Sequence, residues 1–308
     1  MESDKNKKFA EGLNRLKQPI LPLVKMVEFL YLTGPCKTVQ ELLARLTKPV
    51  VLEGLHYENP QQALQSYEGI IREFEVLKGG KKLSTALPFI VNEKQVPLAR
   101  RQSLECWIWQ HILSAELEEI NSKLCGPCNC VLCCTGPNSA FDALSGFRGK
   151  MKQEYFEIPL ADNEVALFVL PRIDTEESRA HTVQSSPAFQ VNHVVFYRRE
   201  MAMYHWQNGW SLILPEGAAC PQLATDTKRC MVYAKRPTVC RKPQIFPYLL
   251  EKTNDRAKRN DGREIPVYMA RHKMLAVWDC PYVREFQDEI GAYAEMSGLE
   301  PIFKRSKT

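Results

Sequence analysis

Five cysteines fall within ten consecutive residues, in the string CGPCNCVLCC that covers residues 125–134. The string holds two successive C-x2-C pairs, and such a pair lets two thiolates face one metal ion while backbone N–H groups donate to the sulfurs. Three more cysteines follow at intervals of ten residues, and a further one precedes a proline late in the chain. The candidate metal ligands are Cys125, Cys128, Cys130, Cys133, Cys134, Cys220, Cys230, Cys240 and Cys280.

The setting of these cysteines favours metal ligation over disulfides. The chain opens with MESDKNKKFAEGLNRLK, which is charged and holds no apolar segment, so we expect no signal peptide and a cytoplasmic protein. A cysteine set in such a protein indicates metal binding or catalysis. The six histidines fall outside the cysteine boxes, which argues against a hydrolytic zinc site. Cys36 and Cys106 stand apart, and we expect them to be buried apolar residues.

The number of thiols leaves the metal open. Four thiolates suit either a tetrahedral zinc ion or a [4Fe–4S] cluster, and eight or nine exceed one simple site. Basic residues around the second cysteine group would stabilise the negative charge of metal-bound thiolates; an ordinary solvated basic face is the alternative. Within this group Tyr233, Arg236 and Arg241 are candidates to contact a bound cofactor or substrate. A structural role for the arginines, as donors to carbonyls of the ligand loops, is the other interpretation.

Four segments resemble the YkgJ-like cysteine-cluster family, also described as the CxxCxxCC or zinc/iron-chelating domain. They are C-N-C-V-L-C-C-T-G, C-P-Q-L, C-M-V-Y-A-K-R-P-T-V-C-R-K-P-Q-I-F-P and a late C-P. The resemblance covers residues 125–294, and R-P-T-V-C-R is its most specific part. It implies binding of zinc or of an iron–sulfur cluster. Pro127 stands where the box would have its first cysteine, so Cys125 and Cys128 compete for one ligand position.

Two functions follow from these observations. The first is an iron–sulfur protein, with [4Fe–4S] favoured over zinc, that has a redox or modifying-enzyme role; a looser similarity to flagellin lysine-N-methylase implies the modifying activity. The alternative is a non-enzymatic, zinc-stabilised protein-binding module. The partner is then a protein or a small-molecule substrate of unknown identity. A net charge of +5 and a pI near 8.6 make a nucleic-acid partner unlikely, and no apolar run is long enough to span a membrane.

The elements that must position the cysteines indicate an α+β protein. We expect a helical region over residues 1–124 and a cysteine-cluster metal-binding domain with a small antiparallel sheet over residues 125–308. Helices are predicted at 39–46, where Thr38 and Glu41 form a capping box, at 60–78, at 97–124 and at 281–294. Strands are predicted at 164–170 and 191–198, a hairpin at 204–214 around Asn208-Gly209, a loop at 171–187 and a charged, solvated segment at 251–264.

The two cysteine groups are expected to meet. Residues 135–219 separate them, and the entropic cost of closing such a loop grows only slowly with its length. We therefore predict that the Cys130/Cys133/Cys134 box and the Cys220/Cys230/Cys240 group share one metal centre. Cys280 would lie near it at the start of the last helix, where the helix dipole favours a thiolate.

Overall fold

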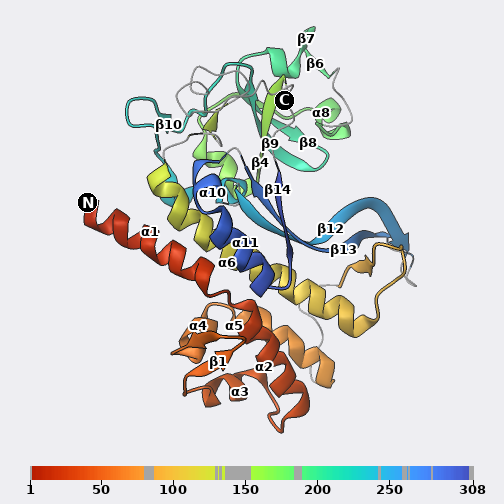
Figure 1. The fold of residues 1–308 in the computed structure, drawn as a ribbon. Coiled ribbons are helices and arrows are strands. Elements are labelled where there is room, and N and C mark those ends of the chain that lie inside the picture. The colour runs from red at the N-terminus through yellow and green to blue at the C-terminus, as the bar shows by residue number, and fades with distance from the viewer. Residues whose placement is uncertain are drawn as a thin grey trace. The chain divides into compact units, whose positions relative to one another are not determined.

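The computed structural model describes residues 2–79, 87–128, 131, 134–135, 154–183, 189–241, 244–258, 262, 264–278 and 280–304 of the chain (Figure 1). The chain divides into two compact units, each assembled from segments that are distant in sequence. Unit 1 consists of Met1–Lys123, Ile245–Ala276 and Phe286–Phe303. Unit 2 consists of Leu124–Gln244, Val277–Glu285 and Lys304–Thr308.

Helices dominate the first part of unit 1. They are α1 (Glu2–Lys17), α2 (Leu21–Thr33), α3 (Val39–Arg45), α4 (Pro60–Gln65), α5 (Glu68–Ile71), the 3₁₀ helix η1 (Arg72–Lys78) and α6 (Arg100–Cys128). The predicted cap of α3 is confirmed, because the Thr38 hydroxyl accepts a hydrogen bond from the Glu41 N–H at 3.1 Å. The single helix predicted over 60–78 is wrong. The Tyr67 N–H bonds to the Leu64 carbonyl three residues back, which ends α4 and starts a new helical segment.

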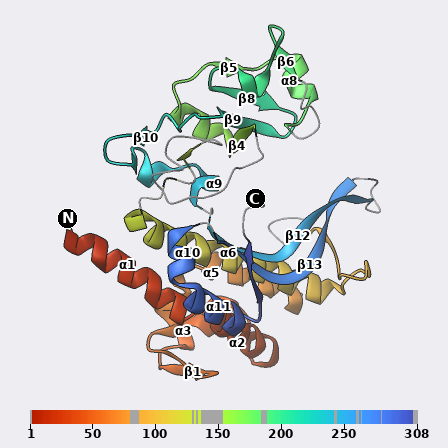
Figure 2. The ribbon, with the colours of Figure 1, turned by 45° about the horizontal axis from the view of Figure 1, so that its top comes forward.

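The strands of unit 1 come mostly from the later part of the chain (Figure 2). They are β1 (Val50–Leu52), β2 (Leu55–Tyr57), β3 (Phe89–Val91), β12 (Ile245–Lys258), β13 (Glu264–Val277) and β14 (Glu300–Lys304). β1 and β2 form a hairpin, and β12, β13 and β14 form a sheet that β3 joins in parallel with β13. The charged segment 251–264 is largely exposed, as expected, but most of it is strand. Glu251 pairs with Arg271 of the neighbouring strand at 2.7 Å, so its charge supports the sheet.

Helix α6 holds unit 1 together through buried polar contacts as well as apolar ones. Glu116, which is 1% exposed, accepts hydrogen bonds from the Ile20 N–H at 2.9 Å and from the Tyr293 hydroxyl at 2.6 Å. Asn121 donates to the Ile245 carbonyl at 2.7 Å and accepts from its N–H at 3.2 Å. These contacts fix the start of α2, the helix α11 (Gln287–Met296) and the start of β12 on α6.

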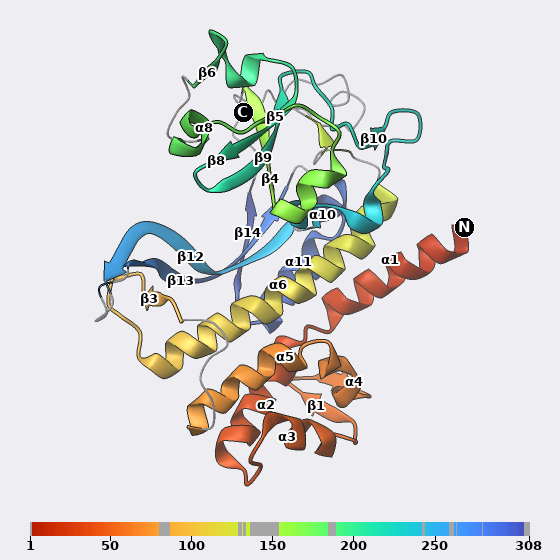
Figure 3. The same cartoon turned by 180° about the vertical axis from the view of Figure 1, so that it is seen from behind.

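Unit 2 is built on a four-stranded sheet in the order β4-β9-β8-β5 (Figure 3). Its strands are β4 (Tyr155–Leu160), β5 (Arg172–Ile173), β8 (Ala202–Trp206) and β9 (Gly209–Pro215), and the parallel pairing of β5 with β8 is its one departure from an antiparallel sheet. Two short hairpins are β6 (Gln190–Val191) with β7 (Val194–Val195) and β10 (Leu223–Ala224) with β11 (Arg229–Cys230). The helical segments are η3 (Asp162–Leu167), α8 (Glu176–Ala180), η4 (Phe196–Arg198), η5 (Tyr233–Lys235), α9 (Thr238–Arg241) and α10 (Pro281–Glu285).

The predicted α+β class is confirmed, and so is the hairpin at 204–214. Its two-residue turn is Gln207–Asn208 rather than the predicted Asn208-Gly209. Gly209 instead opens β9 opposite Trp206 with a φ of 113°, a conformation that favours glycine. The predicted loop at 171–187 is not all loop, because it contains β5 and α8. The last helix is also interrupted, since Phe286 separates α10 from α11.

Two strand predictions in unit 2 are wrong. Residues 164–170 begin in η3 rather than in a strand, because the Glu164 side chain accepts a hydrogen bond from the Ala161 N–H at 2.9 Å and so stabilises a helical turn. Residues 191–198 contain only two-residue strands. Asn192 and His193 have positive φ values of 53° and 64°, which turn the chain between β6 and β7.

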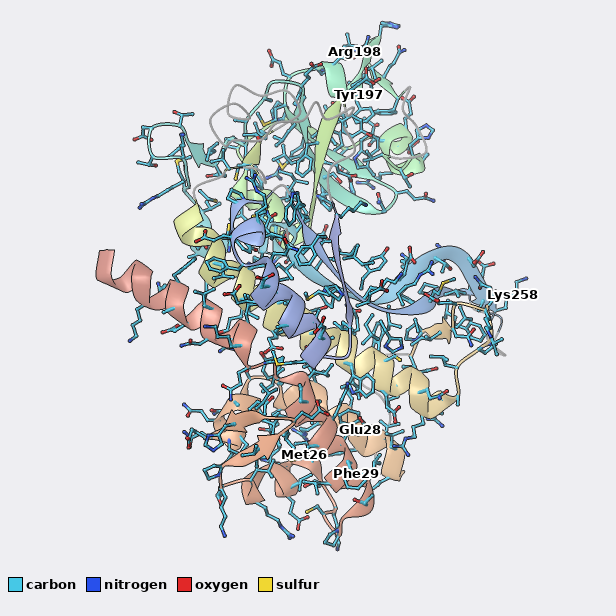
Figure 4. The ribbon with its side chains drawn as sticks, viewed as in Figure 1. Met26, Glu28, Phe29, Tyr197, Arg198 and Lys258 are labelled. Atoms are coloured by element: carbon cyan, nitrogen blue, oxygen red, sulfur yellow. The ribbon has the colours of Figure 1, made fainter. Side chains whose placement is uncertain are left out.

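The two faces of the unit 2 sheet bury different side chains. Tyr204 and Trp206 of β8 stack at 5.2 Å within an aromatic cluster on one face. This cluster also receives Tyr197 from η4, and Tyr197 and the adjacent Arg198 are labelled in Figure 4. Met203 and Leu212 belong to an aliphatic cluster on the other face, because side chains alternate along a strand. The cysteine segments pack against this aliphatic cluster.

Candidate metal centre

The predicted ligands differ in how far the structure describes them. Cys130 and Cys133 lie outside the described residues. The predicted proximity of Cys133 to Cys240 therefore stays a prediction. Cys128 is in the last turn of α6, and its side chain is not described. The remaining candidates all belong to unit 2 and are Cys125, Cys134, Cys220, Cys230, Cys240 and Cys280.

Cys134 and Cys220 are neighbours despite their separation in sequence. The Cys220 N–H donates to the Cys134 carbonyl at 2.7 Å, and Thr135 and Ala219 form an antiparallel bridge beside them. Cys220 is 9% exposed and is part of the aliphatic cluster, against which the half-buried Cys134 packs. The end of the CGPCNCVLCC string therefore lies directly beside the first cysteine of the later group.

Cys240 reaches the same aliphatic cluster from α9. It is half-buried and packs against the cluster that contains Cys220. Its N–H donates to the carbonyl of the buried Pro237 at 2.9 Å, which forms a tight turn just before the cysteine. The structure thus brings Cys134, Cys220 and Cys240, from three separate segments, onto one apolar cluster.

Glu164 in η3 positions the segment that carries Cys240. Its Oε1 accepts hydrogen bonds from the Thr238 N–H at 2.7 Å and from the Thr238 hydroxyl at 2.8 Å. Partial burial acts to raise the pKa of this carboxyl, but the hydrogen bonds from Ala161 and Thr238 and the charge of Arg241 lower it below its ordinary value. Glu164 is therefore a carboxylate that fixes the start of α9. Sequence reasoning missed this role, because the partners are 74 residues apart.

The hairpin β10–β11 carries Cys220 and Cys230 and is also attached to η3. The Leu223 N–H donates to the Cys220 carbonyl at 2.9 Å, and Leu223 pairs with Cys230 across the hairpin. The Gln222 side-chain amide donates to the Leu167 carbonyl at 2.6 Å. One short 3₁₀ helix thus positions both loops that supply the later cysteines.

The three predicted cofactor contacts lie against one another in the ligand loops. The guanidinium carbon of Arg236 lies 3.9 Å from the centre of the Tyr233 ring, and Arg236 is only 6% exposed. The Arg241 Nε donates to the Arg236 carbonyl at 3.0 Å. These contacts are those of the structural interpretation, in which the arginines shape the loops between Cys230 and Cys240. A direct contact with a cofactor stays a prediction.

Cys280 is fully buried and directly precedes α10. Its N–H donates to the Val277 carbonyl at 3.0 Å, and its carbonyl accepts from the Arg284 N–H at 3.2 Å as α10 begins. Cys125 is half-buried in α6, one residue after the buried Leu124. The position of Cys280 at the start of a helix is the one expected from its sequence.

The donor set suits a soft metal, because thiolates prefer zinc and iron–sulfur clusters over hard cations. Within the described ranges, no three Cys, His, Asp or Glu side chains lie close enough together to hold a metal ion. Two cysteines of the string, Cys130 and Cys133, fall outside those ranges. Across the part of the chain that is described, no helix is both long and apolar enough to cross a membrane.

A comparison of the chain with curated proteins and with solved structures found no match. A family model matches residues 124–262, and its description is "CxxCxxCC: Putative zinc- or iron-chelating domain". The matched range contains the CGPCNCVLCC string and the cysteines at 220, 230 and 240, and it leaves the N-terminal helices unmatched. This match confirms the resemblance up to residue 262 and supports a metal-binding role, whereas Cys280 and the late C-P segment lie outside the matched range. Residues 124–262 are therefore similar to the CxxCxxCC family of zinc- or iron-chelating domains.

Proposed function

We propose that unit 2 is an iron–sulfur centre with a redox or protein-modifying role, held by cysteine thiolates from both the CGPCNCVLCC string and the later cysteine segments. The observation that carries the proposal is the contact between Cys134 and Cys220, whose backbones are hydrogen-bonded at 2.7 Å. Cys240 packs on the same cluster as both of them. Packing of three cysteine-bearing segments on one apolar cluster supports a shared thiolate site, to which the string would add the thiols of Cys130 and Cys133.

The number of thiols exceeds what one zinc ion can bind, so it allows a cluster either alone or beside a zinc ion. A [4Fe–4S] cluster takes four thiolates, and so does a structural zinc ion. The chain offers nine cysteines at and after residue 125, which is more than one tetrahedral ion can use. In this proposal, one group of four holds the cluster, and the remainder serve a second centre or the apolar core.

A zinc-stabilised protein-binding module is the second candidate, and one observation favours it. Arg236 and Arg241 bind groups of their own loop, namely the Tyr233 ring and the Arg236 carbonyl. Each arginine thus has a contact within its own loop that needs no cluster. A structural zinc ion would add folding energy to loops that contain only short helices and strands.

The two candidates differ in what the purified protein contains. The full chain is purified without oxygen, and its iron, zinc and acid-labile sulfide are measured together with its visible absorption. Iron with matching sulfide and broad visible absorption supports the cluster. A colourless protein with stoichiometric zinc rejects the cluster in favour of the second candidate. Absence of both metals from a folded protein refutes both candidates.

Matched variants show whether the metal is held where we propose. Cys220→Ser and Cys240→Ser change thiols on the shared cluster, whereas Cys36→Ser changes a buried thiol of unit 1. We expect the first two to lose metal and the third to keep it. If Cys220→Ser and Cys240→Ser both retain the metal, the later segments do not supply its ligands.

A further inference from the structure

The segments that carry Cys230 and Cys240 also present a mixed basic and apolar surface to solvent. Met231 is 62% exposed, Val239 is 39% exposed and Tyr233 is 38% exposed. Three cations alternate with them along the chain. We call this set the basic–apolar surface, and its members are Lys228, Arg229, Met231, Tyr233, Lys235 and Val239.

The charge of this surface is one-sided. Residues 225–241 contain five lysines and arginines but a single carboxylate, Asp226. Lys228, Arg229 and Lys235 form no ion pair with any residue of the described ranges. The carboxylate of Glu164, which holds this segment, accepts its hydrogen bonds from Thr238 and Ala161. Among the described residues, these three cations are therefore not neutralised by an ion pair.

The surface has a defined shape because its two halves are attached to η3. The Met231 N–H donates to the Gln222 carbonyl at 2.7 Å, which extends the β10–β11 ladder, and Gln222 is bonded to Leu167. The Thr238 end is held by Glu164. Figure 3 shows the β10–β11 hairpin extending away from the four-stranded sheet of its unit. A fixed projection that exposes Met231 and Val239 to water has the character of an interaction site.

We propose that the basic–apolar surface binds an acidic protein segment that carries apolar side chains between its carboxylates. Carboxylates of such a segment would pair with Lys228, Arg229 and Lys235, and its apolar side chains would cover Met231 and Val239. Burial of these apolar groups supplies affinity, while the charge pairs select the partner and speed association. The proposal rests on the proposed function only because the metal centre holds the loops that form the surface.

An acidic protein segment fits this surface better than a nucleic acid. Sequence-independent nucleic-acid sites combine cations with aromatic rings whose faces are open for base stacking. The aromatic ring here is that of Tyr233, and the Arg236 guanidinium covers one of its faces at 3.9 Å. Contacts to phosphates would also leave Met231 and Val239 uncovered, whereas an amphipathic acidic segment matches both kinds of side chain.

The test measures binding of a fluorescent peptide by anisotropy, using the full chain with its metal content determined. The probe is a short peptide in which Glu and Asp alternate with Leu and Phe. The comparison ligands are a peptide of the same length in which Ser replaces Leu and Phe, and a mixed-sequence single-stranded oligonucleotide. We expect the amphipathic acidic peptide to bind most tightly, with an affinity that falls as salt is added.

Matched variants locate the site. Arg229→Glu combined with Lys235→Glu should weaken binding about tenfold or more, and Met231→Ser should weaken it severalfold, through lost charge pairs and lost apolar burial respectively. Lys258→Glu is the control, because Lys258 is an exposed lysine of β12 in unit 1 (Figure 4) and its substitution makes one of the two charge reversals of the double variant. We expect its affinity to match the wild type.

The outcomes separate this proposal from the proposed function. If the metal-loaded wild type fails to bind the amphipathic peptide, the proposal is overturned and the metal centre is unaffected. It is also overturned if the oligonucleotide binds more tightly than the peptide and loses affinity in the same variants. A third contrary result is that Lys258→Glu weakens peptide binding as much as the double variant does. Protein purified without metal would instead count against the proposed function.

Discussion

Glu164 offers the sharpest test of how the ligand loops are positioned. Its carboxylate accepts two hydrogen bonds from Thr238, at 2.7 and 2.8 Å, two residues before Cys240. Glu164→Ala removes the oxygen that accepts both hydrogen bonds and leaves the start of α9 without its attachment to η3. We expect this variant to bind its metal more weakly, because the energy needed to order the Cys240 segment is then taken from metal binding.

The size of the effect follows from the two hydrogen bonds. A hydrogen bond to a charged group contributes roughly 1.5–3 kcal/mol. Glu164 is only half-buried, so we take about 1–2 kcal/mol for the pair of bonds together, since solvent screens such contacts. At about 1.4 kcal/mol for each factor of ten, metal affinity should fall by roughly 5- to 30-fold.

The assay is a competition for zinc between the protein and a chromophoric chelator. Glu200→Ala is the control, because Glu200 is an exposed glutamate of the same unit that forms no hydrogen bond or ion pair within the described ranges. Thr238→Val should weaken affinity less than Glu164→Ala, since it keeps the backbone donor. If Glu164→Ala binds zinc as tightly as Glu200→Ala does, the positioning role of Glu164 is refuted.

Three further predictions follow from the same structure. Burial raises the pKa of Glu116 from 4.5 to about 7. Between these pH values the carboxyl is protonated in the folded protein but ionised in the unfolded chain. The free energy of unfolding should therefore fall by up to about 3 kcal/mol as the pH rises from 4.5 to about 7. Urea unfolding of Glu116→Gln should show a flatter pH dependence than the wild type, and the same slope in both would contradict this. Cys36→Ala and Cys106→Ala should leave the metal content unchanged, because both thiols are buried in unit 1 and burial raises the pKa of Cys106 to about 11. If metal analysis finds a loss in either variant, that cysteine is a ligand. Chelation should expose unit 2 to protease while the helical signal of unit 1 persists, and simultaneous loss of both would show that unit 1 also depends on the metal.

The features that could be predicted from the sequence depend on residues close together in the chain. The CGPCNCVLCC string predicts a metal site because its thiols are within a few residues of one another. The Thr38 cap and the turn at Asn208 are likewise set by neighbouring residues, and the structure has both. The family match at residues 124–262 rests on the same local spacing.

The features that could not be predicted depend on pairs that are distant in sequence. The return of residues 245–276 to unit 1 is fixed by contacts such as that between Asn121 and Ile245, 124 residues apart. Glu164 lies in an apolar stretch that reads as a strand, and only its distant partner Thr238 gives it a positioning role. Short-range patterns do not predict either pairing, because a hydrogen bond between distant segments does not change the spacing of apolar and polar residues along the chain.

The central claim is that thiolates of the CGPCNCVLCC string and of the later segments share one metal centre. X-ray absorption at the edge of the bound metal tests it most directly, with the wild type compared to Cys220→Ser and Cys36→Ser. We predict a sulfur shell at about 2.3 Å in the wild type, the same shell in Cys36→Ser and a loss of sulfur or of the metal in Cys220→Ser. A shell of nitrogen or oxygen in the wild type, or an unchanged sulfur shell in Cys220→Ser, would contradict the claim.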